Sequence, residues 1–316
     1  DSLQDAIESL TSPDQRILAG GTDLLGCLRD VVFSATTVVS ISHLDTLRGI
    51  AETPDGGLRI GALTTITELT ESPLINKRYP GLAAAAREVA SPQLRNQGTI
   101  GGNLCQRPRC WYFRGEFQCL RKGGDLCYAF GGENQYHAIF GSDGKCCMVH
   151  PSDLAPVLVA LEATARIIGP KGNRMTPIAG FYVLPAEHVE KETVLEPGEI
   201  LTEILLPKPA SGLRTSYRKV RTRRSWDFAI AGLALALVMK GGLVERARVV
   251  LSGAAPAPWR SKETEQALTG KQLDASTIEA AAQAGVANAE PLEHNGYKVP
   301  LFKAVLEEEL TAMAQQ

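Results

Sequence analysis

The chain has 316 residues, of which 44% are hydrophobic and 22% charged, and its formal net charge is -2 at pH 7. This composition indicates a folded protein of about two domains and excludes a disordered or collagen-like chain. The balanced charge predicts no nucleic-acid partner, and no apolar run reaches the roughly 20 residues of a membrane span.

The expected elements alternate between helix and strand. In chain order we expect a helix over 3–10, a strand over 16–19, a helix from Asp23, strands over 37–41 and 58–63, and helices over 65–69 and 81–89. Pro92 breaks the last of these helices, and residues 96–150 show no sustained period. A helix over 154–163, strands over 165–168, 204–206 and 216–220, a buried segment over 229–238, a strand over 247–252 and helices over 262–268, 276–289 and 301–314 follow.

The stretch Pro207–Gly212 is the best candidate for a linker, because its two prolines and glycine suit neither helix nor strand. It predicts a first domain over 1–208 and a small α+β domain over 212–316. The chain begins with Asp1 rather than methionine, so we expect a few residues to precede it, and no signal peptide is recognisable.

Two glycine turns are candidates for binding a phosphate. Ala19-Gly20-Gly21-Thr22-Asp23 joins a strand to a helix, where backbone N–H groups can approach an anion. An ordinary turn with Thr22 or Asp23 as the helix cap explains it equally well. Thr99-Ile100-Gly101-Gly102-Asn103 is the second turn. The chain has neither GxGxxG nor GxxxxGK[ST], so a different nucleotide fold is indicated.

Six of the seven cysteines lie between Cys105 and Cys147, in a loop of about 45 residues that something must organise. The odd number favours a reducing compartment over a disulfide framework. Structural zinc sites usually contain a CxxC pair, and the wide intervals here suit an iron-sulfur cluster better, with unbound core cysteines as the alternative. The candidate ligands are Cys110, Cys119, Cys127 and Cys146.

Two further segments carry polar residues with a simple structural explanation. Ser152 or Asp153 is placed to cap the helix that follows, and a ribose contact is the alternative. Strand alternation puts Tyr217 and Lys219 on one face, so Lys219 is free to point at a ligand. His43, His137, His188 and His294 show no metal spacing, so structural or surface roles are expected.

The ordered set Ala19–Leu25, Thr99–Leu104 and Ser152–Pro156 resembles the FAD-binding medium subunit of the xanthine dehydrogenase and carbon monoxide dehydrogenase family of molybdenum hydroxylases. The resemblance extends to Glu199-Ile200-Leu201 and Tyr217–Val220. The cysteine insertion is similar to that of the 4-hydroxybenzoyl-CoA reductase β subunit and the periplasmic aldehyde oxidoreductase flavin subunit, which hold an extra four-iron cluster. The spacing from Cys110 to Cys119 is shorter than in the reductase-type subunit.

The resemblance implies a vanillyl-alcohol-oxidase (PCMH)-type FAD-binding fold of two α/β subdomains, over about 1–45 and 46–208, followed by the family's small C-terminal domain. It implies an FAD site formed by Ala19, Gly20, Gly21, Thr22, Asp23, Leu24, Thr99, Gly101, Gly102, Asn103, Asp153, Leu201 and Lys219, with the lysine near the flavin ring. It also implies a 4Fe-4S cluster held by Cys110, Cys119, Cys127 and Cys146, with Cys147 as the alternative to Cys146.

The function implied is electron transfer rather than substrate chemistry. A large molybdenum-cofactor subunit and a small 2Fe-2S subunit are the expected partners, in a heterotrimer or its dimer, and the flavin exchanges electrons with an external acceptor or donor. The alternatives are a stand-alone flavoprotein oxidase of the same fold and a zinc-binding interaction module. The expected location is cytoplasmic, or periplasmic through export with a signal-bearing partner.

Overall fold

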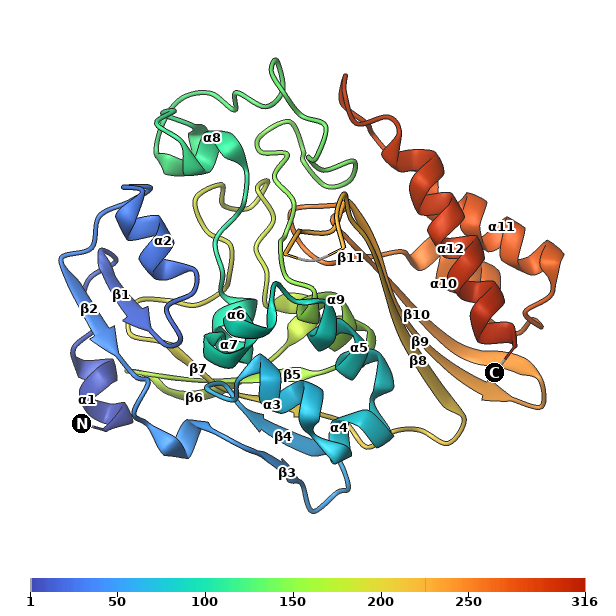
Figure 1. The fold of residues 1–316 in the computed structure, drawn as a ribbon, viewed down its shortest axis with the longest axis horizontal. Coiled ribbons are helices and arrows are strands. Elements are labelled where there is room, and N and C mark those ends of the chain that lie inside the picture. Colours follow the sequence, from blue (N-terminus) through green and yellow to red (C-terminus); the bar gives the residue numbers. More distant parts are fainter. Residues whose placement is uncertain (1, 225, 316) are drawn as a thin grey trace.

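The computed structural model describes residues 2–224 and 226–315. Residues 1, 225 and 316 lie outside the described residues, so the first residue of one predicted domain and the last of the other are not covered. The described chain contains a two-stranded, a five-stranded and a four-stranded sheet, which lie side by side along the long axis of the molecule (Figure 1).

The N-terminal unit consists of α1 (Leu3–Glu8), β1 (Gln15–Leu18), α2 (Leu24–Arg29) and β2 (Thr37–Ser40). Ser2 caps α1, and the Asp5 carboxylate accepts a hydrogen bond from the Ser2 backbone N–H. β1 and β2 pair in parallel. A small core beneath them includes Ile7, Leu10 and Ile41.

The five-stranded sheet is antiparallel and has the order β3-β4-β7-β5-β6. Its strands are β3 (Ile50–Glu52), β4 (Leu58–Gly61), β5 (Thr164–Gly169), β6 (Gly172–Pro177) and β7 (Ile200–Leu206). The helices that accompany it are α3 (Ile66–Glu71), α4 (Pro73–Arg78), α5 (Pro80–Glu88), α6 (Pro92–Gln97), α7 (Ile100–Leu104) and α9 (Leu154–Ala160). The predicted break at Pro92 is present, but the same proline also occupies the first turn of α6, a helix that was not predicted.

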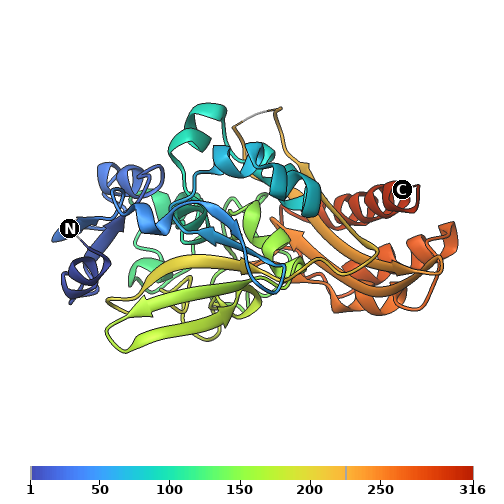
Figure 2. The same cartoon turned by 90° about the horizontal axis from the view of Figure 1, so that it is seen from below.

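The C-terminal part has a four-stranded antiparallel sheet and three helices. The strands are β8 (Leu213–Val220), β9 (Ala231–Lys240), β10 (Leu243–Ser252) and β11 (Trp259–Arg260), and the helices are α10 (Lys262–Leu268), α11 (Ala275–Val286) and α12 (Lys298–Ala314). β9 is buried on both faces: Ala234 and Ala236 pack with α5 and α9, whereas Leu233, Leu235 and Leu237 pack with α10–α12. The last helices therefore cover the outer face of this sheet (Figure 2).

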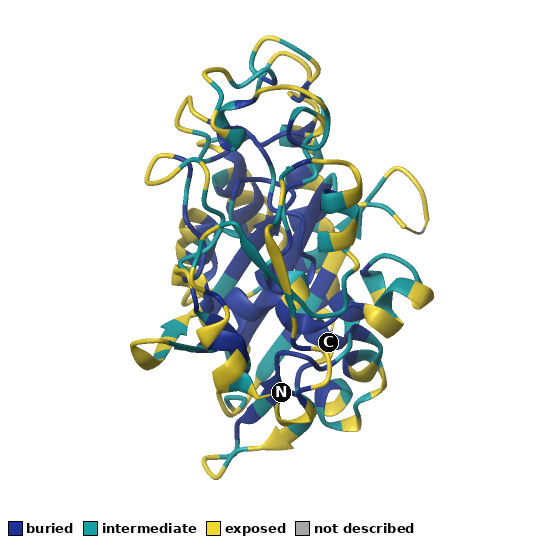
Figure 3. Cartoon of the chain, turned by 90° about the vertical axis from the view of Figure 1, so that its left-hand side faces the viewer, coloured by how far each residue is buried: buried dark blue, intermediate teal, exposed yellow. Residues whose placement is uncertain are grey.

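The cysteine segment forms loops along one side of the molecule, at the top of the view in Figure 1. Its regular elements are α8 (Trp111–Arg114) and the 3-10 turn η2 (Leu120–Lys122); further 3-10 turns are η1 (Asp45–Leu47) and η3 (Ile178–Gly180). Buried residues concentrate in the sheets and the helices packed on them, and exposed residues in the loops around them (Figure 3). No helix in residues 2–224 and 226–315 has the length and apolar character of a membrane span.

Candidate functional site

A cleft of about 870 Å³ lies beside the N-terminal unit, a volume suited to a large organic cofactor. Its walls come from the turn after β1, the first turn of α7, the start of the cysteine segment and the loop before β7. The sequence-predicted residues that line it are Ala19, Gly20, Gly21, Thr22, Asp23, Leu24, Thr99 and Gly102. Cys105, which was left out of the predicted ligand set, lines the cleft as well.

The turn after β1 requires both of its glycines. A Cβ on Gly20 would lie 1.8 Å from the carbonyl oxygen of Gln97, and Gly21 has a φ of +75°. Within the described residues, the backbone N–H groups of Gly20, Gly21 and Thr22 donate no hydrogen bond to the protein. Such unpaired donors at the edge of a cleft suit an anionic ligand.

Asp23 connects this turn to the cysteine segment. It occupies the N-cap position of α2, but its side chain makes no capping hydrogen bond. Its carboxylate accepts from the Arg107 backbone N–H at 2.7 Å, from Arg114 Nη2 at 2.8 Å and from the Arg109 side chain. Burial raises the pKa of Asp23, but the charges of Arg109 and Arg114 outweigh burial and lower it overall.

Thr99 caps α7, and its Oγ1 accepts from the Gly102 N–H at 3.1 Å. The other two predicted residues of this motif do not line the cleft. A Cβ on Gly101 would lie 2.9 Å from Ala62, so Gly101 serves close packing. Asn103 Oδ1 accepts from Ser152 Oγ at 2.5 Å, and this bond joins the second glycine motif to the start of α9.

The remaining predicted FAD residues lie behind the cleft, in the protein core. Leu201 is a buried residue of β7. Lys219 donates to Asp153 Oδ2 at 2.8 Å and to the Glu88 carbonyl at 3.1 Å, and the Tyr217 hydroxyl donates to Asp153 Oδ1 at 2.6 Å. Tyr217 and Lys219 therefore share a face of β8, as predicted, but that face is turned toward Asp153 rather than the cleft.

The side chains of the Asp153–Lys219 pair are 6% and 1% exposed. Burial raises the pKa of the Asp153 carboxyl, although Lys219 and Tyr217 oppose the shift. Asp153 is also the N-cap of α9 by position, but the capping bond comes from Ser152, whose Oγ accepts from the Ala155 N–H at 3.0 Å.

All four predicted cluster ligands line one small cavity. Cys110 precedes α8, Cys119 precedes η2, and Cys127 and Cys146 come from the loops that follow. Cys147 does not line this cavity and is fully buried beside it, where it packs against Cys127. The cavity holds about 20 Å³, so a four-iron cluster requires the segment to expand around it.

These thiols lie among apolar and aromatic residues, with Arg121 as the charged residue of the cavity wall. Burial raises the pKa of Cys110 to about 12, and the hydrogen bond with Cys127, together with burial, raises the pKa of Cys146. His137 Nε2 lies 3.2 Å from Cys110 Sγ. In the part of the chain that the structure describes, no three His, Cys, Asp or Glu side chains are arranged to hold a single metal ion.

The C-terminal part holds the far side of the cysteine segment in place. Asn295 Nδ2 donates to the carbonyls of His137 and Ala138, both at 3.1 Å, and buried Lys298 donates to the His137 carbonyl at 2.9 Å. The sequence reasoning did not find this contact, because the residues are about 160 positions apart. A buried lysine at the start of a helix carries no recognisable sequence signal.

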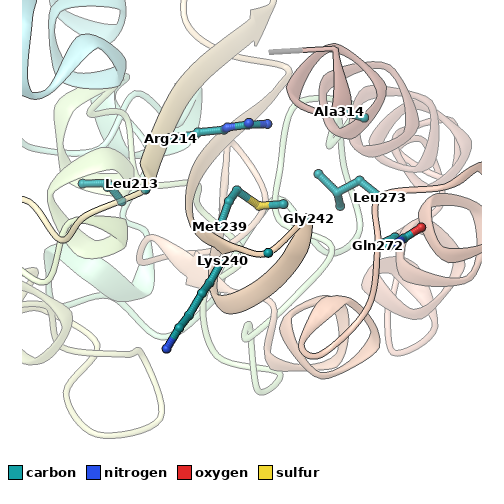
Figure 4. Close-up of a pocket in the computed structure, with 10 residues that line it drawn as sticks. Leu213, Arg214, Met239, Lys240, Gly242, Gln272, Leu273 and Ala314 are labelled. Carbon is teal, nitrogen blue, oxygen red and sulfur yellow. The ribbon is translucent and has the colours of Figure 1, made fainter.

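A second cavity of about 710 Å³ lies at the β9–β10 turn and the end of α12. It contains none of the predicted site residues. Arg214 and Lys240 are its charged residues, and the ammonium end of Lys240 points away from the other labelled side chains (Figure 4). The cleft and the cysteine cavity are therefore the candidate functional site.

Two family sequence models cover most of the chain. The FAD binding domain in molybdopterin dehydrogenase matches residues 1–209, and the CO dehydrogenase flavoprotein C-terminal domain matches residues 215–313. The chain belongs to the FAD-binding subunits of the molybdenum hydroxylase family. This confirms the resemblance and the fold class predicted from the sequence.

Individual relatives agree with the family assignment. The aldehyde oxidoreductase FAD-binding subunit PaoB of Escherichia coli is 36% identical over 305 residues, which cover 95% of this chain and 92% of PaoB. The putative xanthine dehydrogenase FAD-binding subunit XdhB of Escherichia coli is 30% identical over 292 residues, or 92% and 84% of the two chains. A structure of carbon monoxide dehydrogenase from Hydrogenophaga pseudoflava matches with a TM-score of 0.76 at 30% identity, covering 97% of this chain and 92% of the other.

Proposed function

We propose that this chain is the electron-transfer subunit of a molybdenum hydroxylase complex, and that it holds FAD in the cleft and a 4Fe-4S cluster between Cys110, Cys119, Cys127 and Cys146. The observation that carries this proposal is the adjacency of the two sites. Phe113 and Arg121 line both the cleft and the cysteine cavity, so a single layer of side chains separates them. Two redox groups at these places would lie within reach for electron transfer.

The residues of the cleft suit the anionic part of FAD. The unpaired N–H groups of Gly20, Gly21 and Thr22 would bind the pyrophosphate, and Thr99 and Gly102 would contact its other side. Asp23 holds the turn against the cysteine segment. When bound, FAD accepts electrons singly from an iron-sulfur centre and releases them as a pair.

The roles of Asp153, Leu201 and Lys219 are indirect in this proposal. Lys219 and Tyr217 fix the Asp153 carboxylate, and Asp153 follows Ser152, whose hydroxyl binds Asn103. The chain of contacts thus supports the second glycine motif from behind. A direct contact of Lys219 with the flavin ring would need its bond to Asp153 to open.

The donor set of the cysteine cavity suits a cluster, because iron-sulfur clusters take four thiolates. The Cys110 thiol is protonated in the metal-free chain, since burial raises its pKa, so cluster assembly must release a proton there. The exposed aromatic residues Trp111 and Tyr136 of the same segment contact each other edge to face.

The partners in this proposal are a large molybdenum-cofactor subunit, where the substrate reacts, and a small 2Fe-2S subunit. This chain receives electrons from the small subunit and delivers them to an external acceptor, or works in reverse. Relatives described as medium chains or FAD-binding subunits support an assembly of several chains.

The test is a set of cysteine variants of the purified complex. Cys119→Ser and Cys146→Ser should lose iron and acid-labile sulfide while they retain flavin. Cys147→Ser is the matched control and should retain both, because Cys147 lies outside the cavity. If Cys147→Ser loses iron and Cys146→Ser does not, Cys147 is the fourth ligand. If all three variants retain the iron content of the wild type, the cluster proposal is refuted.

A further inference from the structure

Arg121 occupies the wall between the two proposed cofactor sites. It lies in η2, two residues after Cys119, and lines both the cleft and the cysteine cavity. Its side chain is 2% exposed. A guanidinium is always charged in proteins, so this position places a fixed positive charge inside the protein.

Only part of this guanidinium is satisfied by the protein. Nη1 donates to Glu192 Oε1 at 2.9 Å and to the Lys191 carbonyl at 3.2 Å. Nε and Nη2 are buried and make no well-oriented hydrogen bond within the described residues, although the Cys146 side chain lies within hydrogen-bond reach of the guanidinium. Buried unpaired donors of a charged group are costly, so such atoms point to a missing acceptor.

The acceptor must lie on the side of the cysteines. Arg121 lines the cysteine cavity together with Cys119 and Cys146, so sulfur atoms are the acceptors nearest to its unpaired N–H groups on that side. Glu192 is already bound to Nη1 and also pairs with Arg107 Nε at 2.8 Å. The guanidinium is planar, so the bonds at Nη1 fix the direction of the other N–H groups.

We propose that Arg121 donates through Nε and Nη2 to sulfur atoms of the cluster site, including Cys146, and thereby positions the cluster and sets its reduction potential. This inference rests on the proposed function. Hydrogen bonds and positive charge at the sulfur atoms stabilise the more negative, reduced form of a cluster. Arg121 therefore raises the potential of the cluster, which shifts the equilibrium for an electron shared with a flavin on the other side of the same residue toward the cluster.

The experiment is a potentiometric titration of the cluster in the purified complex, followed by electron paramagnetic resonance of the reduced form. Wild type, Arg121→Gln and Arg121→Lys are compared, with iron, sulfide and flavin measured on each sample. Arg246→Gln is the charge control, because Arg246 pairs with Glu162 on the exposed side of β10 and lines neither site.

Arg121→Gln should reduce the ratio of reduced to oxidised cluster at a fixed solution potential by about tenfold, which is about 59 mV for one electron. Arg121→Lys keeps the charge but loses the planar pair of donors, so it should show a smaller shift in the same direction. Arg246→Gln should match wild type.

A potential that is unchanged in Arg121→Gln with a full cluster would overturn the inference. So would equal loss of flavin and iron in both Arg121 variants, because that result indicates a general structural role. If Arg121→Gln loses only the cluster and Arg121→Lys retains a shifted one, the inference stands. Wild-type complex without iron would instead refute the cluster proposal itself, and the two failures are thus distinguishable.

Discussion

The buried pair of Asp153 and Lys219 gives the sharpest test of the structure itself. We expect Lys219→Met to destabilise the flavin-free chain by about 3–5 kcal/mol at pH 7, because it leaves a buried carboxylate with only the Tyr217 hydroxyl. The pair is 2.8 Å apart and its side chains are 1% and 6% exposed, so the full penalty of an uncompensated buried charge applies. At about 2–4 °C per kcal/mol, the melting temperature should fall by about 6–20 °C.

The pH dependence has a defined sign. Without Lys219 the pKa of folded Asp153 rises further above that of the unfolded chain, so the variant gains protons on folding. Its deficit relative to wild type should therefore be small near pH 4 and grow as the pH rises toward 7.

The assay is thermal unfolding followed by circular dichroism at pH 5 and 7. Asp153→Asn in the Lys219→Met background should recover most of the loss. Lys240→Met is the matched control, since its ion pair with Glu245 on the β9–β10 turn is exposed and is worth less than about 1 kcal/mol. If Lys219→Met lowers the melting temperature no more than Lys240→Met does, or if its effect is the same at pH 5 and pH 7, the reasoning is refuted.

Three other predictions concern the cleft and the C-terminal contact. Gly20→Ala should weaken flavin binding and lower the melting temperature, because its Cβ would lie 1.8 Å from the Gln97 carbonyl oxygen. Gly26→Ala should be neutral or stabilising, because a Cβ at this position of α2 meets open space. Equal effects of the two substitutions would contradict the argument. Asp23→Asn should weaken flavin binding about tenfold, or about 1.4 kcal/mol, in a fluorescence titration, because it weakens the hydrogen bonds from Arg109 and Arg114. Asp30→Asn is the control: Asp30 belongs to an exposed ion pair, so its substitution should leave flavin binding unchanged. Burial lowers the pKa of Lys298 to about 7, so folding releases protons there and the stability of the wild type should rise from pH 7 to 10. Lys298→Met should lack this rise, and stability curves of the two proteins that run parallel with pH would refute the prediction.

The sequence predicts those elements whose pattern is set by burial on one side. The expected helix over 262–268 coincides with α10, and the strands over 37–41 and 216–220 match β2 and most of β8. β6 was not predicted, because it is an exposed edge strand with the polar sequence GNRMTP and no alternating apolar residues. A residue such as Pro92 can end one helix and begin the next, and only the packing of α6 reveals the second role.

The same limit applies to the site. The glycine turns and the four cysteines are local signals, and the structure brings the turn residues to one cleft and the cysteines to one cavity. Arg121 and His137 gave no such signal, because their importance depends on contacts with Glu192 and Cys110 that only the fold creates. The placement of Lys219 against Asp153, rather than in the cleft, is likewise a consequence of how β8 packs on α5.

The measurement that tests the central claim most directly is the visible spectrum of the anaerobically purified chain, with flavin, iron and acid-labile sulfide determined on the same sample. The account predicts flavin bands over a broad absorption that dithionite bleaches, with one FAD and about four iron atoms per chain. Protein that binds neither FAD nor iron would contradict the account, and FAD without iron would leave the cleft intact and refute the role of the cysteine cavity.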